Sequence, residues 1–500
     1  MSEHFDVVIV GAGISGVGAG YHLQDKSPDR SYVILEGRDS MGGTWDLFRY
    51  PGIRSDSDMY TLGYNFRPWT EAKAIADGPA ILKYVRETAA AYGIDRRIRY
   101  NHMVRRASWS TETATWTVEA EQAGRPVTFT CNFLFLCGGY YNYEAGYTPD
   151  WEGTDRFQGR IVHPQHWPQD LDYAGKRVVV IGSGATAVTL VPEMARTAGH
   201  VTMLQRSPTY VVSRPAQDAL ANWLRSKLPP MLAYGLTRWK NVLLTMVFYN
   251  LARKRPEKTR ERLLGMVREQ LGPDFDVATH FTPRYNPWDQ RLCLVPDADL
   301  FDALKAGTAS VVTDTIETFT ETGLKLASGA ELPADVIVTA TGLNLQVWNG
   351  LEISVDGQVV EAARTMSYKG MMYSDVPNMA SSFGYTNASW TLKCDLTCEY
   401  VTRLLNHMKR AGLRQATPRL KDSEVTPEPW LDFSSGYVQR SIGRFPRQGS
   451  RAPWKLHQNY ARDLMALRFG TLTDEAMEIS NPAPGAAAKA DRPARTLEAA

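Results

Sequence analysis

The stretch FDVVIVGAGISG, residues Phe5–Gly16, decides the fold of this chain of 500 residues. A short apolar run leads into a Gly-x-Gly-x-x-Gly pattern and then into a helix-forming segment, which predicts a strand, a tight turn and a helix. Gly11 permits the turn, Gly13 lets the backbone approach a pyrophosphate, and Gly16 lets the helix pack close to the strand. A second strand is predicted to end at Glu36, where a carboxylate binds ribose hydroxyls. Together these features predict a dinucleotide site for FAD or NAD.

A second strand–turn–helix pattern follows in the middle of the chain. The predicted strand 177–181 runs into Gly-x-Gly-x-x-Ala, formed by Gly182, Ser183, Gly184, Ala185, Thr186 and Ala187. The next predicted strand, 200–204, leads not to an acid but to Arg206 and Ser207. An arginine at this place accommodates the 2′-phosphate of NADP, so we predict NADPH here and prefer this to a solvated surface arginine. The fold class that follows is α/β with two Rossmann-like dinucleotide-binding domains.

The composition is that of an ordinary globular protein. Hydrophobic residues make up 43% and charged residues 22%, and the formal net charge is +2, so no nucleic-acid partner is expected. No apolar stretch is long enough to span a bilayer, and the chain enters a strand almost at once, so we expect no signal peptide. Five scattered cysteines indicate a reducing compartment, and we expect a cytoplasmic protein.

Two pairs of side chains invite a metal or redox interpretation that we do not adopt. His163 and His166 are close in sequence, but no Cys or acid cluster accompanies them, so no metal site is predicted. Cys394 and Cys398 lie one turn apart on a predicted helix, and buried thiols are preferred over a redox pair.

The segment between the two motifs, FQGRIVHPQHWP at 157–168, has a spaced pattern made by Phe157, Gly159, His163, Trp167 and Pro168. Without its flanks the pattern would indicate a surface linker with a buried aromatic residue at each end. Between two dinucleotide motifs, it resembles the fingerprint of type I Baeyer–Villiger monooxygenases, flavoproteins that turn ketones into esters. The resemblance extends from residue 5 to about residue 460 and is closest to the ethionamide-activating subgroup.

The resemblance implies FAD and NADPH as cofactors, O2 as a reactant, and a small ketone or sulfide as the substrate. In the family, reduced flavin and O2 give a C4a-peroxide that attacks a ketone only as the anion. Arg291 matches the catalytic arginine, whose permanent charge keeps the peroxide deprotonated and stabilises the oxyanion of the adduct. Asp56 matches the aspartate that holds this arginine. Oxidation of thioethers and thioamides is also implied.

The loop GGTWDLFRYPGIRSD at 42–56 resembles a second signature of the same family. The residues that it implies for the flavin site are Gly43, Thr44, Trp45 and Asp56, together with Val104 and Asn387. His163 is implied to couple NADPH to oxygenation. One departure concerns Gln290, because many relatives have a lysine there that helps to bind the 2′-phosphate. The preference for NADPH then rests mainly on Arg206.

We expect the chain to be divided into an FAD-binding domain (1–154 and 373–480), an NADP-binding domain (155–214 and 286–372), a helical insertion (215–285) and a disordered tail (481–500). The insertion combines an apolar stretch with many basic residues. That pattern is compatible with peripheral contact to a membrane surface. We favour a helix that packs its apolar face on the protein, as most amphipathic helices do.

Two other functions stay open from the residues. A heteroatom-oxygenating flavin monooxygenase shares the plan of two dinucleotide sites, but its fingerprint ends differently from Trp167-Pro168 and it lacks an equivalent of Arg291. A flavoprotein that acts as an NADPH oxidase or redox sensor would consume NADPH regardless of substrate.

Overall fold

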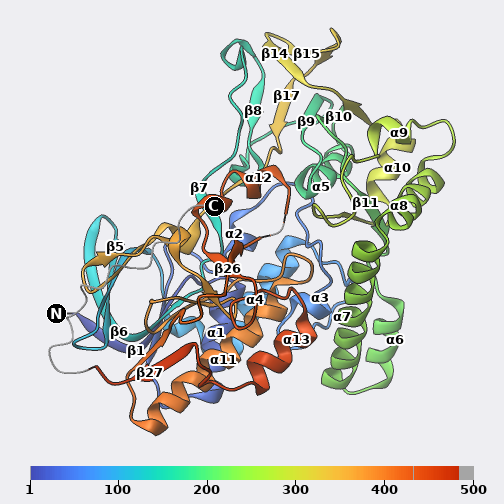
Figure 1. Cartoon of the computed structure of the whole chain (residues 1–500). Helices are drawn as coiled ribbons and strands as arrows, with labels where there is room; N and C mark the ends of the chain where they lie inside the picture. Colours follow the sequence, from blue (N-terminus) through green and yellow to red (C-terminus); the bar gives the residue numbers. More distant parts are fainter. Residues whose placement is uncertain (1, 432, 483–500) are drawn as a thin grey trace.

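The larger of two main sheets lies at the lower left of Figure 1, and the computed structural model describes residues 2–431 and 433–482. Nine strands form this sheet in the order β20-β19-β4-β5-β6-β1-β2-β3, with β23 paired to β6. Their bounds are β1 Glu3–Val10, β2 Tyr32–Leu35, β3 Ile98–Arg99, β4 His102–Ser110, β5 Thr115–Gln122, β6 Arg125–Leu136, β19 Glu352–Val355, β20 Gln358–Val359 and β23 Met379–Ser381.

Strand β1 is central in this sheet because its residues are apolar on both faces. It runs parallel to β2 on one side and to β6 on the other. Val7 and Ile9 pack in a core with helices α1 (Ile14–Lys26), α4 (Gly78–Ala91) and α11 (Trp390–Ala411). Val8 packs on the opposite face with Trp109 and Trp116. A strand that is covered on both faces has an uninterrupted apolar sequence, and that pattern predicted strand β1.

The second sheet, at the top of Figure 1, has five strands in the order β13-β10-β9-β17-β8, and each pairing is parallel. The bounds are β8 Arg160–Val162, β9 Arg177–Ile181, β10 His200–Gln205, β13 Ala309–Thr313 and β17 Val336–Thr339, with helices α5 Ala185–Met194 and α10 Asp299–Lys305. This sheet and the β1–α1–β2 unit of the first confirm the predicted fold class of two Rossmann-like units in an α/β protein.

The chain passes between the two sheets along a two-stranded ribbon. Strand β7 (Tyr141–Gly146) leaves the first sheet and pairs antiparallel with β18 (Leu343–Leu345), which returns to it. Strands β19 and β20 lie in the range 286–372 that the sequence assigned to the NADP-binding domain, but β19 pairs with β4 of the first sheet. We therefore propose that the return crossing lies at β18. These strands are too short to have shown a periodic pattern.

Smaller elements fill the edges of the two main units. The remaining strands are β11 Val211–Arg214, β12 Cys293–Pro296, β14 Ile316–Thr320, β15 Gly323–Leu326, β16 Glu331–Pro333, β21 Ser367–Tyr368, β22 Met372–Tyr373, β24 Gln415–Pro418, β25 Pro427–Pro429, β26 Arg447–Gly449 and β27 Met477–Ser480. The remaining short helices are α2 Thr44–Leu47, α3 Met59–Leu62, α9 Val277–His280, α12 Gly436–Gln439 and α13 Tyr460–Leu464.

The helical insertion stands at the right of Figure 1 and consists mainly of α6 (Ala219–Lys227), α7 (Pro230–Lys254) and α8 (Pro256–Leu271). One side of α7 packs on the first unit, where buried Arg238 donates to the carbonyls of Tyr60 and Gly63, each at 2.8 Å. The expectation that the apolar face would pack on the protein is wrong in part, because Leu243 and Leu244 are 53% and 61% exposed. Helix α7 has apolar side chains on more than one side. The protein covers only one of these sides, so the other is exposed to solvent.

Across residues 2–431 and 433–482, the structure contains no helix with the length and apolar character needed to cross a membrane. The predicted disordered tail, 481–500, lies outside the described residues from position 483 onward.

Candidate active site

A cavity of about 450 Å³ brings both dinucleotide motifs together. The predicted site residues that line it are Gly11, Gly13, Glu36, Gly43, Thr44, Trp45, Asp56 and Val104 from the first unit, and Ala185, Thr186 and Arg291 from the second. Gly11, Gly13, Glu36 and the start of α5 follow the carboxyl ends of strands, which is where α/β sheets bind ligands, whereas Val104 lies within β4 and Arg291 precedes β12. The cavity therefore has one dinucleotide motif at each side and Arg291 in its wall.

Helices α1 and α5 both begin with a glycine that makes no side-chain capping bond. The N-caps are Gly13 and Gly184, and neither helix has an acid in its first turn. The first N–H groups of each helix are therefore available to an anion, and the helix dipole favours negative charge at the same place. This fits the pyrophosphate of a dinucleotide at each motif.

The glycines of the first motif have different reasons for lacking a side chain. A Cβ on Gly16 would lie 1.9 Å from the carbonyl oxygen of Gly11, so only glycine permits this approach of helix to turn. A Cβ on Gly13 would meet nothing closer than the Cα of Gly43, at 3.5 Å. Gly13 and Gly43 thus lie against each other and form a stretch of cavity wall without side chains, which fits a pyrophosphate that lies on this backbone surface.

Glu36 lies at the end of β2, as predicted, and its carboxylate is already ordered. One oxygen accepts the N–H of Ala12 at 2.7 Å and the other accepts the N–H of Arg38 at 3.0 Å. Burial raises the pKa of Glu36, while these two bonds act in the opposite direction. Each carboxylate oxygen has a second lone pair, so Glu36 can still accept from a ribose hydroxyl.

Asp46 organises the loop after Gly43 and was missed by the sequence analysis. Its side chain is only 1% exposed. Ser40 donates to it at 2.5 Å, and it forms ion pairs with Arg38 at 2.8 Å and with Arg86 at 3.0 Å. A buried carboxylate needs such partners, and they fix the path of the loop that holds Thr44 and Trp45 against the cavity. Sequence spacing contains no signal for a partner as distant as Arg86.

Arg291 and Asp56 form a two-pronged ion pair across the boundary between the units. The Nε of Arg291 lies 2.7 Å from one carboxylate oxygen of Asp56, and Nη2 lies 3.0 Å from the other. The Asp56 charge raises the pKa of Arg291 further above its already high ordinary value. The guanidinium is therefore charged at every working pH, and its orientation is fixed by a bidentate contact. Its side chain remains 38% exposed, so the cation is accessible.

Three tyrosines surround the exposed side of this pair, and the sequence analysis did not single them out. Tyr140, Tyr141 and Tyr437 line the same cavity as Arg291. Burial raises the pKa of Tyr141 to about 12, so its hydroxyl keeps its proton and can donate. The YYNY run at 140–143 was the available signal, but aromatic runs more often indicate core packing.

A second cavity of about 200 Å³ adjoins the first and shares Asp56 and Arg291 as lining residues. Its other walls combine apolar side chains, including Val242, Met246, Phe248 and Leu392, with polar ones such as Asp58 and Gln458. Asn387, predicted for the flavin site, lines this second cavity and not the first. The amide of Asn387 donates to the carbonyl of Gln458 at 2.9 Å, while its oxygen is buried without a partner. The arginine pair therefore stands where the two spaces meet.

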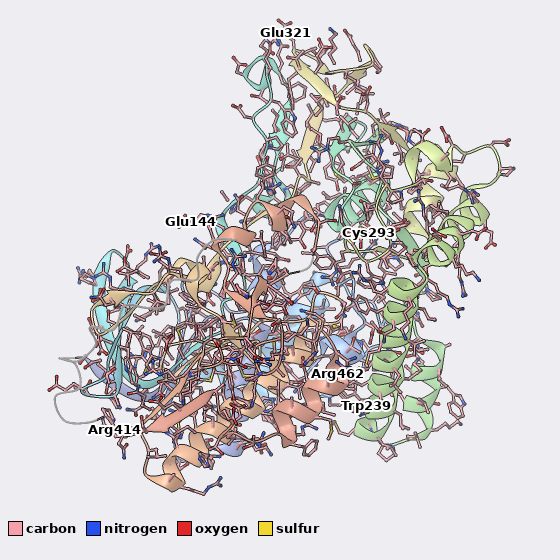
Figure 2. All side chains as sticks on the ribbon, in the orientation of Figure 1. Glu144, Trp239, Cys293, Glu321, Arg414 and Arg462 are labelled. Atoms are coloured by element: carbon pink, nitrogen blue, oxygen red, sulfur yellow. The ribbon has the colours of Figure 1, made fainter. Side chains whose placement is uncertain are left out.

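Figure 2 shows where this region lies. Cys293, two residues after Arg291 at the start of β12, is labelled between the two units and above α7. The Cys293 thiol is buried and its backbone N–H donates to the carbonyl of Tyr210 at 2.9 Å, which ties the arginine loop to the second unit.

The fingerprint segment lies at the crossing ribbon. Phe157 is buried against Phe319, and a Cβ on Gly159 would lie 2.4 Å from the carbonyl oxygen of Asp335. Residues 160–162 form edge strand β8 beside β17, and Trp167 packs against the core of the second unit. Pro168 follows this tryptophan and closes the fingerprint.

His163 joins the fingerprint to both strands that cross between the units. Its Nδ1 accepts the N–H of Gln165 at 3.2 Å, so Nε2 carries the proton and donates to the carbonyl of Gly342 at 3.2 Å. A Cβ on Gly146 would lie 2.0 Å from the ring. Burial lowers the pKa of His163, which favours this neutral form. The histidine therefore contacts the end of β7 and the residue before β18, at the interface between the two units.

The residues predicted for NADP lie at the carboxyl edge of the second sheet, and most of them are at least partly exposed. Ser183 donates to the carbonyl of Ser207 at 3.0 Å, which holds the turn after β9 against the turn after β10. Arg206 and Gly184 are exposed. A charged side chain beside an uncapped helix N-terminus fits a phosphate-bearing ligand. Ala187 is fully buried, in the position where the first motif has Gly16.

All five cysteines are buried and unpaired, and burial raises the pKa of Cys394 to about 12, which confirms the prediction of buried thiols. In the part of the chain that the structure describes, no group of three or more metal-ligating side chains is present.

Known proteins match this chain along nearly its whole length. The sequence model of the flavin-binding monooxygenase-like family matches residues 73–378. The model of the NAD(P)-binding Rossmann-like domain matches residues 9–74. The FAD-containing monooxygenase EthA of Mycobacterium tuberculosis is 58% identical over 486 residues, which cover 97% of this chain and 99% of that protein.

Two solved structures share the fold. The oxidized steroid monooxygenase bound to NADP is 22% identical with a TM-score of 0.75, over 96% of this chain and 100% of that one. The open structure of cyclohexanone monooxygenase is 20% identical with a TM-score of 0.73, over the same shares of 96% and 100%. At this level of identity the likeness concerns the fold.

Proposed function

This chain belongs to the flavin-binding monooxygenase-like family, and from that premise we propose that it is a Baeyer–Villiger monooxygenase. Membership and the likeness to an FAD-containing relative make it a flavin-dependent monooxygenase, and the family resemblance inferred from the sequence is confirmed. The finer proposal is that it uses NADPH and O2 to insert one oxygen atom beside a ketone carbonyl, giving an ester. Oxidation of thioethers and thioamides at the same site is part of this proposal.

The observation that carries the proposal is the Asp56–Arg291 pair at the junction of the two cavities. When a negatively charged oxygen attacks a ketone, a C–O bond forms, the C=O π bond breaks, and the charge moves from the attacking oxygen to the carbonyl oxygen. A fixed cation that stays protonated can stabilise both positions without reorganising. Attack on a sulfide needs no such cation, so the charged and oriented guanidinium favours ketone chemistry over heteroatom oxidation alone.

The first cavity is the proposed flavin site. When bound, FAD passes the electrons of NADPH to O2 and so supplies the oxygen atom that is transferred. Glu36 holds a ribose hydroxyl, the N-terminus of α1 with Gly13 and Gly43 holds the pyrophosphate, and Val104 flanks the adenine end. Thr44 and Trp45 wall the ring end near Arg291. Asn387 contributes from the second cavity, where its unpaired oxygen can accept from a ligand.

The apolar walls of the second cavity suit a small hydrophobic substrate. Val242, Met246 and Phe248 come from α7 and offer no charge to a substrate, while Arg291 lies at one end of the space. A ketone that enters with its carbonyl toward Arg291 buries its hydrocarbon part against these side chains. The name of the cyclohexanone monooxygenase, a structural neighbour, also names a ketone.

The experiment that tests this proposal offers a linear methyl ketone and a thioether together, with NADPH and O2, and identifies the products by mass. Ester formation is expected, with or without sulfoxide. Sulfoxide as the sole product would favour the heteroatom monooxygenase instead. NADPH consumption that is unchanged when both substrates are omitted would favour an oxidase.

Replacing Arg206 by alanine is expected to raise the KM for NADPH about 10- to 100-fold and to leave the KM for NADH unchanged. A charge-assisted hydrogen bond to a phosphate contributes about 1.5–3 kcal/mol, and only NADPH carries the 2′-phosphate. Steady-state kinetics with each nucleotide measures this difference. Gln290 cannot replace the lost charge, so no residual preference is expected from that side chain.

The matched control is Arg196→Ala. Arg196 is also exposed and also near α5, but it follows the C-terminal end of that helix, away from the proposed phosphate site. Equal effects of Arg206→Ala on NADPH and NADH would contradict the assignment of Arg206 to the 2′-phosphate.

A further inference from the structure

Helices α6 and α7 present a continuous apolar stripe to solvent. The large hydrophobic side chains in it are 44–61% exposed: Leu220, Trp223, Met231, Leu232, Leu236, Trp239, Leu243, Leu244, Val247 and Leu251. Those on α7 recur at intervals of three and four residues, which places them on one side of the helix. Monomeric proteins rarely leave a patch of this kind open, and such patches mark interaction surfaces.

The charged residues of the segment that carries the stripe have one sign. Between Asp218 and Glu257 the sequence contains lysines and arginines but not a single acidic residue. Some of these cations serve the protein itself, such as buried Arg238 and Lys240, which pairs with Asp218. Lys227, Lys254 and Arg255 are exposed at the ends of α6 and α7. A basic rim around an apolar stripe complements an anionic lipid surface.

The opposite side of α7 lines the proposed substrate cavity. Val242, Met246 and Phe248 face that space, while Leu243, Leu244 and Val247 face solvent. Trp239, labelled in Figure 2 beside Arg462 at the edge of the molecule, packs its ring 5.7 Å from that of Tyr460, which also lines the cavity. One helix, about 10 Å thick, thus separates the stripe from the cavity.

We propose that the α6–α7 stripe docks on an anionic lipid surface, with its apolar side chains among the acyl chains and its basic rim at the headgroups. Tryptophans such as Trp223 and Trp239 suit the boundary between headgroups and hydrocarbon. Docking places the second cavity one helix away from hydrocarbon, where apolar substrates concentrate. The contact is peripheral, because the helices lie along the surface of the protein as in Figure 1.

A second copy of this chain is the rival occupant, and charge disfavours it. A symmetric contact of two stripes would bring the two basic rims together without an acidic partner, because the same segment lacks acids. Like charges at an interface oppose association. An anionic membrane provides the missing opposite charge.

The test is flotation of the flavin-loaded enzyme with phosphatidylcholine vesicles, with and without phosphatidylserine, at low and high salt. The enzyme is expected to float with anionic vesicles and to be released by salt. The triple substitution Leu243→Gln/Leu244→Gln/Val247→Gln should weaken binding about 100-fold, at roughly fivefold for each half-exposed side chain. The pair Lys227→Gln/Lys254→Gln should weaken it about 20-fold on anionic vesicles alone.

The matched control is Val359→Gln, since Val359 is 62% exposed on β20 in the first sheet, outside the insertion. It should float like the unaltered enzyme, and flavin absorbance per protein should be the same in all variants. Flotation needs no turnover, so this outcome is independent of the proposed reaction.

Three results would overturn the proposal. The first is that the enzyme binds no vesicle. The second is that the triple variant binds vesicles as well as the unaltered enzyme does. The third is that light scattering finds a dimer, that the triple substitution dissociates it, and that neither dimer nor monomer binds vesicles. The stripe would then be covered by a second copy of this chain.

Discussion

Replacing Arg291 by alanine is expected to reduce ester formation about 100- to 1000-fold, because the reaction loses the cation that Asp56 holds where the two cavities meet. Arg291 lies in the cavity wall and is held by Asp56 through two contacts at 2.7 and 3.0 Å. The flavin site proper is formed by other residues, so flavin content and NADPH oxidation should persist, with reduced O2 released as hydrogen peroxide. The measurement is ester yield per NADPH consumed.

The pH profile separates a lost charge from a shifted one. Asp56 raises the pKa of Arg291, so in the unaltered enzyme this group does not titrate in the working range. The loss in Arg291→Ala should therefore be the same at every working pH, and lowering the pH should not recover it. Arg291→Lys keeps a charge without the fork and should retain part of the activity.

The partner substitution is Asp56→Asn, which keeps the size of the side chain and removes its charge. A roughly tenfold loss is expected, because Arg291 stays in place but is no longer held by a charged fork. Ester formation at the unaltered rate in Arg291→Ala would contradict the proposed role of this pair.

Replacing Gly16 by alanine is expected to destabilise the first unit by about 3 kcal/mol or more and to yield protein with little bound flavin. Alanine normally stabilises a helix relative to glycine by about 1 kcal/mol. Here the added Cβ would lie 1.9 Å from the carbonyl oxygen of Gly11, an atom of the backbone that cannot move aside. Thermal unfolding and flavin absorbance measure the two effects.

Gly13→Ala is the matched control in the same turn. Its Cβ would lie 3.5 Å from the nearest protein atom, an ordinary contact, and its backbone at φ −80° suits alanine. The protein without flavin should therefore unfold at an unchanged temperature, while flavin binding is weakened because the methyl group adds bulk to the cavity wall beside Gly43. A Gly16→Ala variant as stable and as flavin-rich as the unaltered enzyme would contradict the packing account of this turn.

The regular elements of the fold were predictable because their causes are local. Strands β1 and β9, at Glu3–Val10 and Arg177–Ile181, each end in an apolar run of four residues that leads into a glycine turn. Strands β19 and β20 were not predicted in the first sheet. They are too short to show a period, and their position depends on β4, about 250 residues earlier in sequence.

The candidate site was only partly predictable from the residues themselves. The contact between Asp56 and Arg291 joins positions separated by 235 residues, and only the family resemblance suggested it. The structure brings the two together, while their chemical roles stay predictions. The Asp46 cluster had no such signal, because its partner Arg86 comes from a distant segment, and the YYNY run at 140–143 is more typical of core packing than of a site.

The insertion shows a limit of amphipathic reasoning. An amphipathic pattern is usually interpreted as a helix with one apolar face, which packs on the rest of the protein. Helix α7 is apolar toward the second cavity at Met246 and also toward solvent at Leu243 and Val247. A sequence that is apolar on two sides does not specify which side the protein will cover, so the exposed stripe emerged only from the folded arrangement.

The most direct test of the central claim uses isotopically labelled O2, NADPH and a linear methyl ketone, and measures the mass of the product. Our account predicts an ester with one heavy oxygen atom, formed by the unaltered enzyme and nearly absent with Arg291→Ala. An enzyme that consumes NADPH and oxygen, converts a thioether to its labelled sulfoxide and leaves every ketone unchanged would contradict it.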